Sequence, residues 1–258
     1  MIKKLVSLIL AACACACASV APVTASLEDC SEYSEYGIPG SDGTLLCRMG
    51  YLLAHDEQFL TPIWVAERLT REKVAGKAVR KDNFKPDPDL LPGKRAELTD
   101  YKGSGYDRGH MAPAADMKWH QKAMDESFYL SNIIPQNSNN NQQIWATLET
   151  HVRDWVLVRG EIIVYSGPIH DNDEANLTIG NNKVAVPDRL YKVIYDPFKK
   201  EAIAFLMPNQ PINAKFLPNY IVTVREIENI TGLDFLSRLP RKEQNRIEKT
   251  KATMWDRK

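Results

Sequence analysis

The sequence predicts an α+β fold, with a central, mainly antiparallel sheet flanked by helices. Runs of strands interrupted by a few helices are typical of this class, whereas strict strand–helix alternation is not. The chain has 258 residues, of which 44% are hydrophobic, which is enough for one sizeable core. We therefore expect a single domain over residues 26–258. The predicted strands cover residues 51–56, 63–69, 128–134, 161–166, 190–195 and 202–206.

The first half of the chain contains a predicted hairpin and an irregular segment. Residues 26–48 are interpreted as a loop-rich entry, and a turn at Thr61-Pro62 joins the first two strands. Three prolines and several glycines predict irregular structure over residues 81–105. Residues 114–126 have the composition of a helix.

The strongest helical pattern follows in the middle of the chain. Between Asn141 and Val158, apolar residues recur at helical spacing, at Ile144, Leu148, Val152 and Trp155. A later helix is predicted over residues 222–230 and ends at Gly232. The tail from Arg241 is polar and rich in both charges.

Residues 1–25 have the pattern of an export signal. Lys3 and Lys4 precede an apolar run, and small residues precede a cut at Ser26. Residues 10–13 also match a lipobox, which would make Cys13 a lipidated N-terminus. The sequence thus predicts a periplasmic or secreted protein, or alternatively a lipid-anchored one in the cell envelope. No later stretch approaches the ~20 apolar residues of a membrane span.

Two cysteines remain after the predicted leader, Cys30 and Cys47. In an oxidising compartment two such cysteines are expected to pair. A bridge of this span stabilises by roughly 3 kcal/mol in the chain-entropy model.

The charge balance does not mark a nucleic-acid binder. The chain has 33 basic and 33 acidic residues, and without Lys3 and Lys4 the count is 31 against 33, or −2. Nucleic-acid-binding proteins are often basic overall. An enzyme that acts on a polyanion, however, needs only a locally basic cleft and must release its products.

A first candidate cluster is Asp107-Arg108-Gly109-His110, which follows a glycine-rich break. Histidine is the natural proton acceptor near neutral pH. Arginine holds a phosphate through a fork of donors. A turn with a structural Asp–Arg pair explains the same four residues equally well.

A second cluster lies on the predicted helix that begins at Asn141. Asn141, Trp145, Glu149 and Arg153 are spaced by four and form a polar seam beside the apolar stripe. Asparagine oxygens suit Mg²⁺, which takes few protein ligands. The alternative is that Asn141 caps the helix and that Glu149 and Arg153 form an ordinary ion pair.

Taken together, the two clusters resemble the DNA/RNA non-specific endonucleases, a family with a ββα-metal active site that includes endonuclease G. The resemblance extends over Tyr101–His110, Gln121–Asp125 and Phe128–Asn132, and continues through Asn141–Glu149 to Ser166-Gly167-Pro168. It covers roughly residues 51–236 and leaves out the leader and the tail.

The resemblance implies a role for each matching residue. His110 would be the general base and Asn141 the protein ligand of the metal. Glu149 would hold metal-bound waters, and Asn132 would orient the histidine region. Arg80, Arg108 and Arg153 would contact the phosphate. Arg108 and Arg153 would also stabilise the transition state.

The activity implied is hydrolysis of DNA and RNA without sugar specificity. A single Mg²⁺, with Mn²⁺ as an alternative, would assist the reaction, leaving 5′-phosphate and 3′-hydroxyl ends. Three rival functions remain: a metal-dependent phosphodiesterase for small nucleotides or pyrophosphates, a non-catalytic nucleic-acid-binding protein, and an adhesive lipoprotein anchored at Cys13. The sequence leaves the oligomeric state open, with a homodimer among the options.

Overall fold

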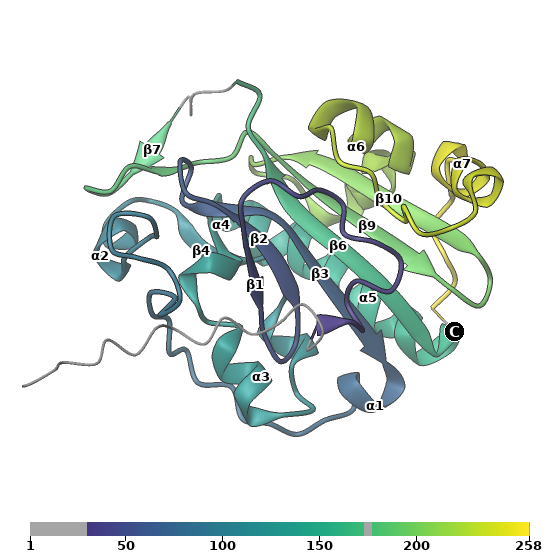
Figure 1. The fold of residues 1–258 in the computed structure, drawn as a ribbon, viewed down its shortest axis with the longest axis horizontal. Helices are drawn as coiled ribbons and strands as arrows, with labels where there is room; N and C mark the ends of the chain where they lie inside the picture. The colour runs from purple at the N-terminus through teal and green to yellow at the C-terminus, as the bar shows by residue number, and fades with distance from the viewer. Residues whose placement is uncertain (1–29, 173–176, 258) are drawn as a thin grey trace, which may run out of the picture.

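A seven-stranded antiparallel sheet forms the centre of the molecule (Figure 1). The computed structural model describes residues 30–172 and 177–257. Every neighbouring pair in this sheet is antiparallel. The predicted α+β fold is confirmed. In spatial order the strands are β1 (Thr44–Cys47), β2 (Leu52–Asp56), β3 (Thr61–Thr70), β6 (Glu161–Ile169), β9 (Arg189–Asp196), β10 (Glu201–Pro208) and β11 (Ile221–Val222).

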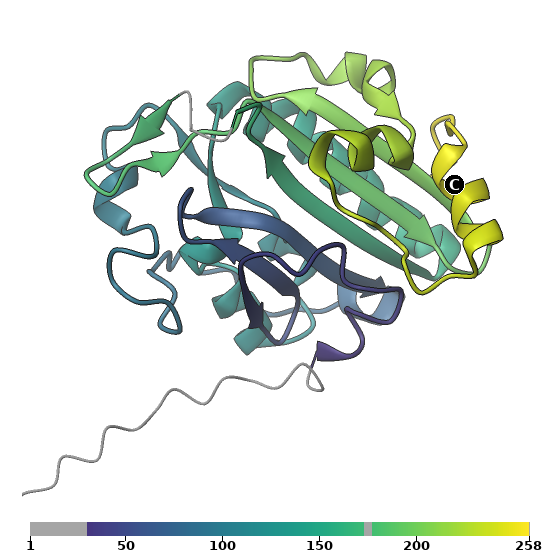
Figure 2. The same cartoon turned by 45° about the horizontal axis from the view of Figure 1, so that its top comes forward.

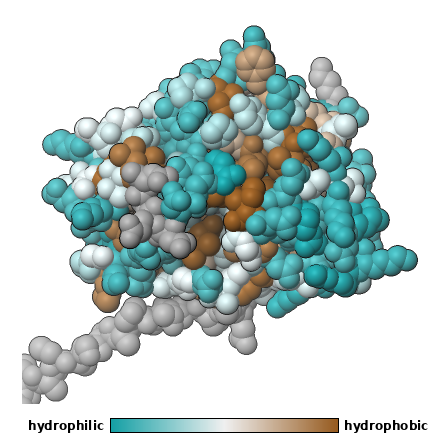
Figure 3. All heavy atoms as spheres, turned by 90° about the horizontal axis from the view of Figure 1, so that it is seen from above, coloured by the Kyte–Doolittle hydropathy of each residue, from teal (hydrophilic) through white to brown (hydrophobic). Residues whose placement is uncertain are grey.

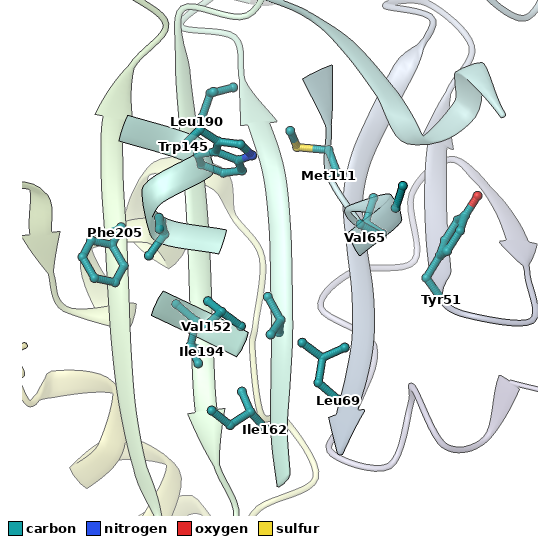
Figure 4. Close-up of a cluster of buried hydrophobic side chains, with 14 of the residues drawn as sticks. Tyr51, Val65, Leu69, Met111, Trp145, Val152, Ile162, Leu190, Ile194 and Phe205 are labelled. Carbon is teal, nitrogen blue, oxygen red and sulfur yellow. The ribbon is translucent and has the colours of Figure 1, made fainter. Parts of the chain in front are cut away.

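Both faces of the sheet are buried, each under its own hydrophobic cluster. Alternate side chains of a strand point to opposite faces, so each strand contributes to both clusters. On β9, Leu190 and Ile194 belong to one hydrophobic cluster, while Tyr191 and Val193 belong to the other. Helix α5 (Ala146–Arg159) covers the first face, and Figure 4 shows its Val152 beside the strand residues. Helices α6 (Val224–Thr231) and α7 (Arg241–Lys249) cover the other face (Figure 2).

A separate two-stranded sheet lies beside the large one. It pairs β4 (Asp107–His110) with β5 (Ile133–Gln136), and His110 stands opposite Ile133. The chain then enters α4 (Ser138–Asn140), a π-helical turn, η4 (Asn141–Trp145), and α5. Strand, strand and helix thus follow one another in chain order, with residues 111–132 between the two strands and only Asn137 between β5 and α4.

The remaining elements are short and connect these layers. They are α1 (Arg71–Val74), α2 (Leu98–Tyr101), η2 (Ala114–Asp116), α3 (Gln121–Glu126), η3 (Leu130–Asn132), β7 (Thr178–Ile179), β8 (Val184–Ala185) and η5 (Ala214–Tyr220).

Several local predictions were wrong at their boundaries. The turn of the first hairpin falls at residues 57–60, where Leu60 has a φ of 59°, and Thr61-Pro62 begins β3. The expected helix over 114–126 is split into η2 and α3. The expected strand over 128–134 is a 3₁₀ turn followed by β5. Asn132 stabilises that turn by donating hydrogen bonds to the carbonyls of Ala112 and Ser127. Strand propensity does not take such side-chain hydrogen bonds into account.

Three ordered regions were not foreseen. The loop-rich entry contains β1, which pairs with β2, and residues 107–110 form a strand. The polar tail folds into α7, whose Ile247 is buried against the sheet. Beyond α7, Trp255 packs edge-on against Trp155 with ring centroids 5.3 Å apart. Ile247 is the one apolar residue among the nine of α7, and this gives too weak a pattern for prediction.

Cys30 and Cys47 form a disulfide, with their Cα atoms 5.8 Å apart. It joins the first described residues to β1. The predicted leader, including the lipobox at Cys13, lies outside the described residues. Within the described residues, no helix is long and apolar enough to cross a membrane.

Figure 3 shows the face that lies at the top of Figure 1. Hydrophobic residues gather at the centre of this face, and hydrophilic residues surround them. The structure has a cavity of about 280 Å³ with a mixed polar and apolar lining, whose apolar walls include Ile63, Ile169, Ile230 and Leu233. These residues come from β3, β6 and the end of α6.

Candidate active site

Five of the predicted site residues meet in one hollow beside the β4–β5 pair. A cavity of about 230 Å³ is lined by Arg80, Arg108, His110, Asn141 and Glu149, among others. A second cavity of about 480 Å³ shares Arg80, Arg108 and Asn141 with the first. The two cavities therefore form a continuous cleft. Segments that are distant in sequence contribute to its walls: the loop after α1, strand β4, and the η4–α5 helix.

His110 ends β4 and packs between two aromatic rings. Its ring centroid lies 5.3 Å from that of Phe84 and 5.1 Å from that of Phe128. Burial, together with the positive charges of Arg80 and Arg108, lowers the pKa of His110 to about 3. His110 is thus neutral at physiological pH. Its buried Nε2 has no hydrogen-bond partner among the described residues, as expected of a group that awaits a ligand.

Gly109 explains how β4 approaches its partner strand so closely. A Cβ built at this position would lie 2.6 Å from the Cβ of Gln136 and even closer to its Oε1. A larger residue would therefore push β4 away from β5. Gln136 in turn donates from Nε2 to Asn140 Oδ1 at 2.9 Å, which ties the strand pair to the start of the helix.

The two exposed arginines of the cleft rest on aromatic faces. The guanidinium carbon of Arg108 lies 4.2 Å from the centre of the Phe84 ring. Arg80 lies 5.4 Å from the centre of Phe128, and its Nε donates to Asp82 at 2.8 Å. Each guanidinium has five donors, so most remain available to a phosphate. The rim of the cleft is therefore locally basic, although the whole chain is not.

Asn141 is oriented by the carboxylate of Asp107. Its Nδ2 donates to Asp107 Oδ2 at 2.9 Å, and Gln142 and Ser138 also donate to this carboxylate. Burial alone would raise the pKa of Asp107, but these three hydrogen bonds hold it below its ordinary value. Because a carboxylate only accepts, the nitrogen of Asn141 faces Asp107 and its Oδ1 stays available for a cation.

The capping interpretation of Asn141 was wrong. Asn137 caps this end of the helix, since its Oδ1 accepts from the backbone of Asn139 and Asn140 at 3.1 Å. Asn141 itself begins the π-helical turn. Such turns inside α-helices are frequent at functional sites.

Glu149 lies one helical turn beyond the π-helical turn and lines the cleft. Burial and the nearby Asp116 raise the pKa of Glu149, Lys192, Arg153 and Arg80 oppose that rise, and the result is a pKa of about 7. This carboxylate therefore changes its charge near neutral pH.

Arg153 does not reach the walls of either cavity. It donates to Asp116 at 2.9 Å and to Thr150 at 3.1 Å. Among the described residues no ion pair joins it to Glu149, so the ordinary i,i+4 pair does not form. Asp116 is the partner that sequence spacing could not reveal. The contact of Arg153 with substrate stays a prediction.

Asn132 is fully buried behind the site. It accepts from the backbone N–H of Ala112 and donates to the carbonyls of Ala112 and Ser127, each at 2.9 Å. Its own carbonyl accepts from Met111 at 3.0 Å. Asn132 therefore holds the two residues that follow His110 and is placed to act through position rather than by contact with substrate.

The oxygen donors of the cleft fit a hard divalent cation. Asn141 Oδ1 and the Glu149 carboxylate belong to the wall of the same cavity. A cation with few protein ligands and several waters suits this sparse set. A strand pair that bears Arg108 and His110, followed by a helix that bears Asn141, defines a ββα-metal type of site.

Comparison with known proteins gives the same result. A family model described as DNA/RNA non-specific endonuclease matches residues 30–242. Mitochondrial nuclease EXOG of Xenopus laevis is 41% identical over 237 residues, which cover 86% of this chain and 66% of that protein. Human mitochondrial endonuclease G is 36% identical over 218 residues, covering 80% and 73%. The chain belongs to the DNA/RNA non-specific endonuclease family.

A solved structure supports the fold directly. A chain in the crystal structure of the EndoG/EndoGI complex superposes with a TM-score of 0.77 at 36% identity, covering 83% of this chain and 94% of that one. This chain spans only 61–66% of the length of the EXOG relatives from Xenopus laevis, Danio rerio, Mus musculus and Homo sapiens.

The predicted periplasmic or secreted location was wrong, and so was its lipid-anchored alternative. The relatives from Xenopus laevis, Schizosaccharomyces pombe and Saccharomyces cerevisiae are all named as mitochondrial nucleases. The prediction rested on the composition of residues 1–25, in which positive residues precede an apolar run. Composition alone does not distinguish one kind of targeting segment from another.

Proposed function

We propose that this chain is a sugar-non-specific endonuclease that hydrolyses phosphodiester bonds of DNA and RNA. The observation that carries the proposal is one cleft in which a neutral His110 lies among Arg80, Arg108, Asn141 and Glu149. We further propose that one Mg²⁺, with Mn²⁺ as an alternative, serves as cofactor and that the products carry 5′-phosphate and 3′-hydroxyl ends.

In this proposal, His110 accepts the proton of the attacking water. Its low pKa keeps it unprotonated, and its orphaned Nε2 supplies an acceptor. A positioned base typically contributes ~10²–10⁴-fold. Arg80 and Arg108 hold the phosphoryl oxygens, and their fixed charge is strongest where negative charge develops. A bound cation would stabilise the same charge and the leaving oxygen.

Asn141 would ligate the cation through Oδ1, oriented by Asp107. Glu149 would accept hydrogen bonds from cation-bound waters, for which its ionised form is required. Arg153 would contact the substrate phosphate through guanidinium donors that its ion pair with Asp116 leaves available.

The shape of the cleft supports a polymer substrate. The outer cavity of about 480 Å³ extends from the catalytic residues past Lys102 and Tyr106. Cationic and aromatic side chains together suit a backbone with flanking bases. Phosphate-directed contacts carry little base information, in keeping with weak sequence preference. The names of the relatives, nuclease EXOG and endonuclease G, support the same substrate class and a mitochondrial location.

Two organisational predictions are retained in this proposal. Residues 26–258 would act as one nuclease domain. The homodimer stays a prediction, and light scattering of the purified chain tests it.

The test compares the wild type with His110→Ala and Asn141→Ala on plasmid, RNA and a small phosphodiester. Both polymers should disappear with Mg²⁺ and persist with a chelator. His110→Ala should lose at least ~10²-fold in rate while retaining its Tm. Asn141→Ala should weaken Mn²⁺ binding measured by electron paramagnetic resonance. Asn181→Ala, an exposed turn position, is the matched control.

Two results would contradict the proposal. Cleavage of the small phosphodiester alone, by well-folded protein, would replace the polymer nuclease with a nucleotide-directed phosphodiesterase. Nucleic-acid binding without turnover would indicate a non-catalytic protein.

A further inference from the structure

The C-terminal end of the chain differs in charge from the rest. Residues 241–258 contain seven basic and three acidic residues, a net charge of +4. Residues 26–240 contain 24 basic and 30 acidic residues, a net charge of −6. A basic segment at one end of an otherwise acidic chain indicates contact with a polyanion. The proposed substrate is a polyanion, yet no described residue of this segment lines either cavity of the cleft.

Helix α7 sorts the charges of this segment by the face on which they lie. The residues that it buries are Gln244, Ile247 and Glu248. Three exposed cations follow one another at spacings of four and three, which place them on one side of the helix: Lys242, Arg246 and Lys249. We call these three residues the basic strip. It extends over about 10 Å along the helix axis, at about 1.5 Å per residue.

The acidic residues of α7 do not neutralise the basic strip. Glu243 pairs at 3.0 Å with Lys200, on the turn between β9 and β10. Glu248 is buried and pairs with Arg225 of α6. Among the residues that the structure describes, no ion pair involves the basic strip. A solvent-exposed helix face typically carries charges of both signs, so a face of one sign indicates an anionic partner.

The partner that fits the basic strip is a nucleic acid rather than a membrane. A basic helix that lies on a membrane inserts an apolar face between the lipids. The one apolar residue of α7, Ile247, is 2% exposed and packs against the sheet. The basic strip therefore offers charge without an apolar anchor, and such charge is what neutralises the phosphates of a nucleic acid.

The basic strip lies far from the catalytic residues. Arg159, the last residue of α5, lines a cavity of about 450 Å³ together with Lys200 and Arg246. Asn141 begins the η4–α5 run 18 residues earlier. At about 1.5 Å per residue, the two ends of this run are about 27 Å apart, which is the length of about eight base pairs of duplex DNA. Figure 1 likewise shows α7 and β4 towards opposite ends of the molecule.

The helix face, rather than this cavity, is the positive surface. Acidic residues line the cavity as well, among them Glu201, which pairs with Arg159 at 3.1 Å. One guanidinium nitrogen of Arg246 donates to the carbonyl of Lys200 at 3.0 Å. A guanidinium has five donors, so Arg246 keeps others for a phosphate.

We propose that the basic strip is a second binding site for the nucleic acid, which holds phosphates of a long substrate while the cleft cleaves it elsewhere. The inference rests on the proposed function, because it takes the substrate to be a polymer. Lysine and arginine contacts to phosphates position a nucleic acid and read no bases. The basic strip thus raises the affinity for long substrates and leaves the chemical step unchanged.

The direct test is the salt dependence of binding to a duplex of about 40 base pairs, measured by fluorescence anisotropy with a chelator in place of the cation. The strip variant combines Lys242→Gln, Arg246→Gln and Lys249→Gln. Each lost phosphate contact lowers the slope of log affinity against log salt by about 0.9, so the slope should become about two to three units shallower. At about 50 mM salt the affinity should fall at least about tenfold. A slope and affinity equal to those of the wild type would overturn the proposal.

The matched control removes the same net charge elsewhere. It combines Lys94→Gln, Lys122→Gln and Lys183→Gln, at three exposed lysines that line neither cavity of the cleft nor the cavity beside α7. Both variants change exposed side chains alone, so both should keep the Tm of the wild type. The control should keep the wild-type slope. An equal loss of affinity in both variants would show a general effect of net charge and would overturn the proposal.

The kinetic consequence depends on the length of the substrate. With Mg²⁺, the strip variant should have a KM for the long duplex that is raised at least about tenfold, and its kcat should not change because the cleft is intact. A tetranucleotide spans about 14 Å at duplex spacing and does not reach both sites, so its kcat/KM should stay at the wild-type value. An equal loss on both substrates would place the effect in the cleft and contradict the proposal.

A chemical footprint of the wild type locates the contact without any substitution. Bound duplex should slow the acetylation of Lys242 and Lys249 by an amine-reactive ester severalfold, as measured by mass spectrometry. Lys122 should react at the same rate with and without the duplex. Unchanged rates at Lys242 and Lys249 would overturn the proposal.

Two further outcomes separate this inference from its alternatives. If the strip variant lost binding to vesicles of anionic lipid but kept its affinity for the duplex, the basic strip would belong to a membrane contact and the proposal would fail. The anisotropy and footprint measurements do not depend on turnover. A wild type that binds the duplex through the basic strip but cleaves no polymer would thus refute the proposed function and leave the second site standing.

Discussion

Replacement of Asn132 with alanine should destabilise the protein far more than a surface substitution would. The side chain makes three hydrogen bonds, each 2.9 Å long, to the N–H and carbonyl of Ala112 and the carbonyl of Ser127. Asn132 is fully buried, so alanine would leave one donor and two acceptors without partners and without water.

The expected cost follows from those three groups. Each unsatisfied buried polar group costs about 1–3 kcal/mol, so the sum at the lower end is about 3–5 kcal/mol once partial relaxation is allowed. A change of this size lowers the Tm of a protein of this length by about 10 °C. Activity should also fall, because Met111 and Ala112 would no longer be fixed beside His110.

Urea denaturation and calorimetry measure the effect. Asn181→Ala, at an exposed turn, should change the free energy of unfolding by less than about 0.5 kcal/mol. If Asn132→Ala unfolded at the temperature of the wild type, the three hydrogen bonds would not stabilise this segment. The account of Asn132 as the residue that positions the His110 region would then fail.

Three further outcomes are expected. Reduction of the Cys30–Cys47 disulfide should cost roughly 3 kcal/mol in urea denaturation; an unchanged midpoint would show that the bridge adds nothing. Burial and the nearby Glu248 raise the pKa of Glu228 to about 7, so stability from this group is present at low pH and declines as pH rises from about 4.5 to about 7. Glu228→Gln should flatten that decline in pH-dependent calorimetry, and an identical pH slope would refute the sign. Trp255→Ala removes the edge contact with Trp155 and should cost about 2 kcal/mol; a wild-type Tm would mean that the tail does not stabilise the core.

The fold class and the main elements could be predicted because each has a local signature. Alternating and continuous apolar runs marked β3, β6, β9 and β10, and the spacing from Ile144 to Trp155 marked α5. Gly232, which has a φ of 73°, ends α6 as expected of a residue without a side-chain clash in the left-handed region. The limits of elements were less predictable, since hydrogen bonds from distant residues set them.

The candidate site was predicted in part. Residue types and spacings brought out Arg108, His110, Asn141, Glu149 and Arg153, and the family resemblance added Arg80. The structure gathers Arg80, Arg108, His110, Asn141 and Glu149 around one cleft. Local spacing predicted at most an Asp–Arg pair for Asp107, whereas its carboxylate accepts from Ser138, Asn141 and Gln142. Lys192 lies more than 30 residues beyond the helix in sequence and inside an apolar strand, so no local pattern marks it.

The sequence by itself determined which chemical groups this protein possesses and, through periodicity, which faces of its strands and long helices are apolar. These follow from neighbours along the chain, because strand and helix repeats are local. The folded molecule alone shows that Arg153 pairs with Asp116, that Asn137 rather than Asn141 caps the helix, and that Lys192 donates to the carbonyl of Met111, next to His110. Such pairings depend on which distant segments meet and on how much water is excluded where they do, and both follow from the packing of the whole sheet.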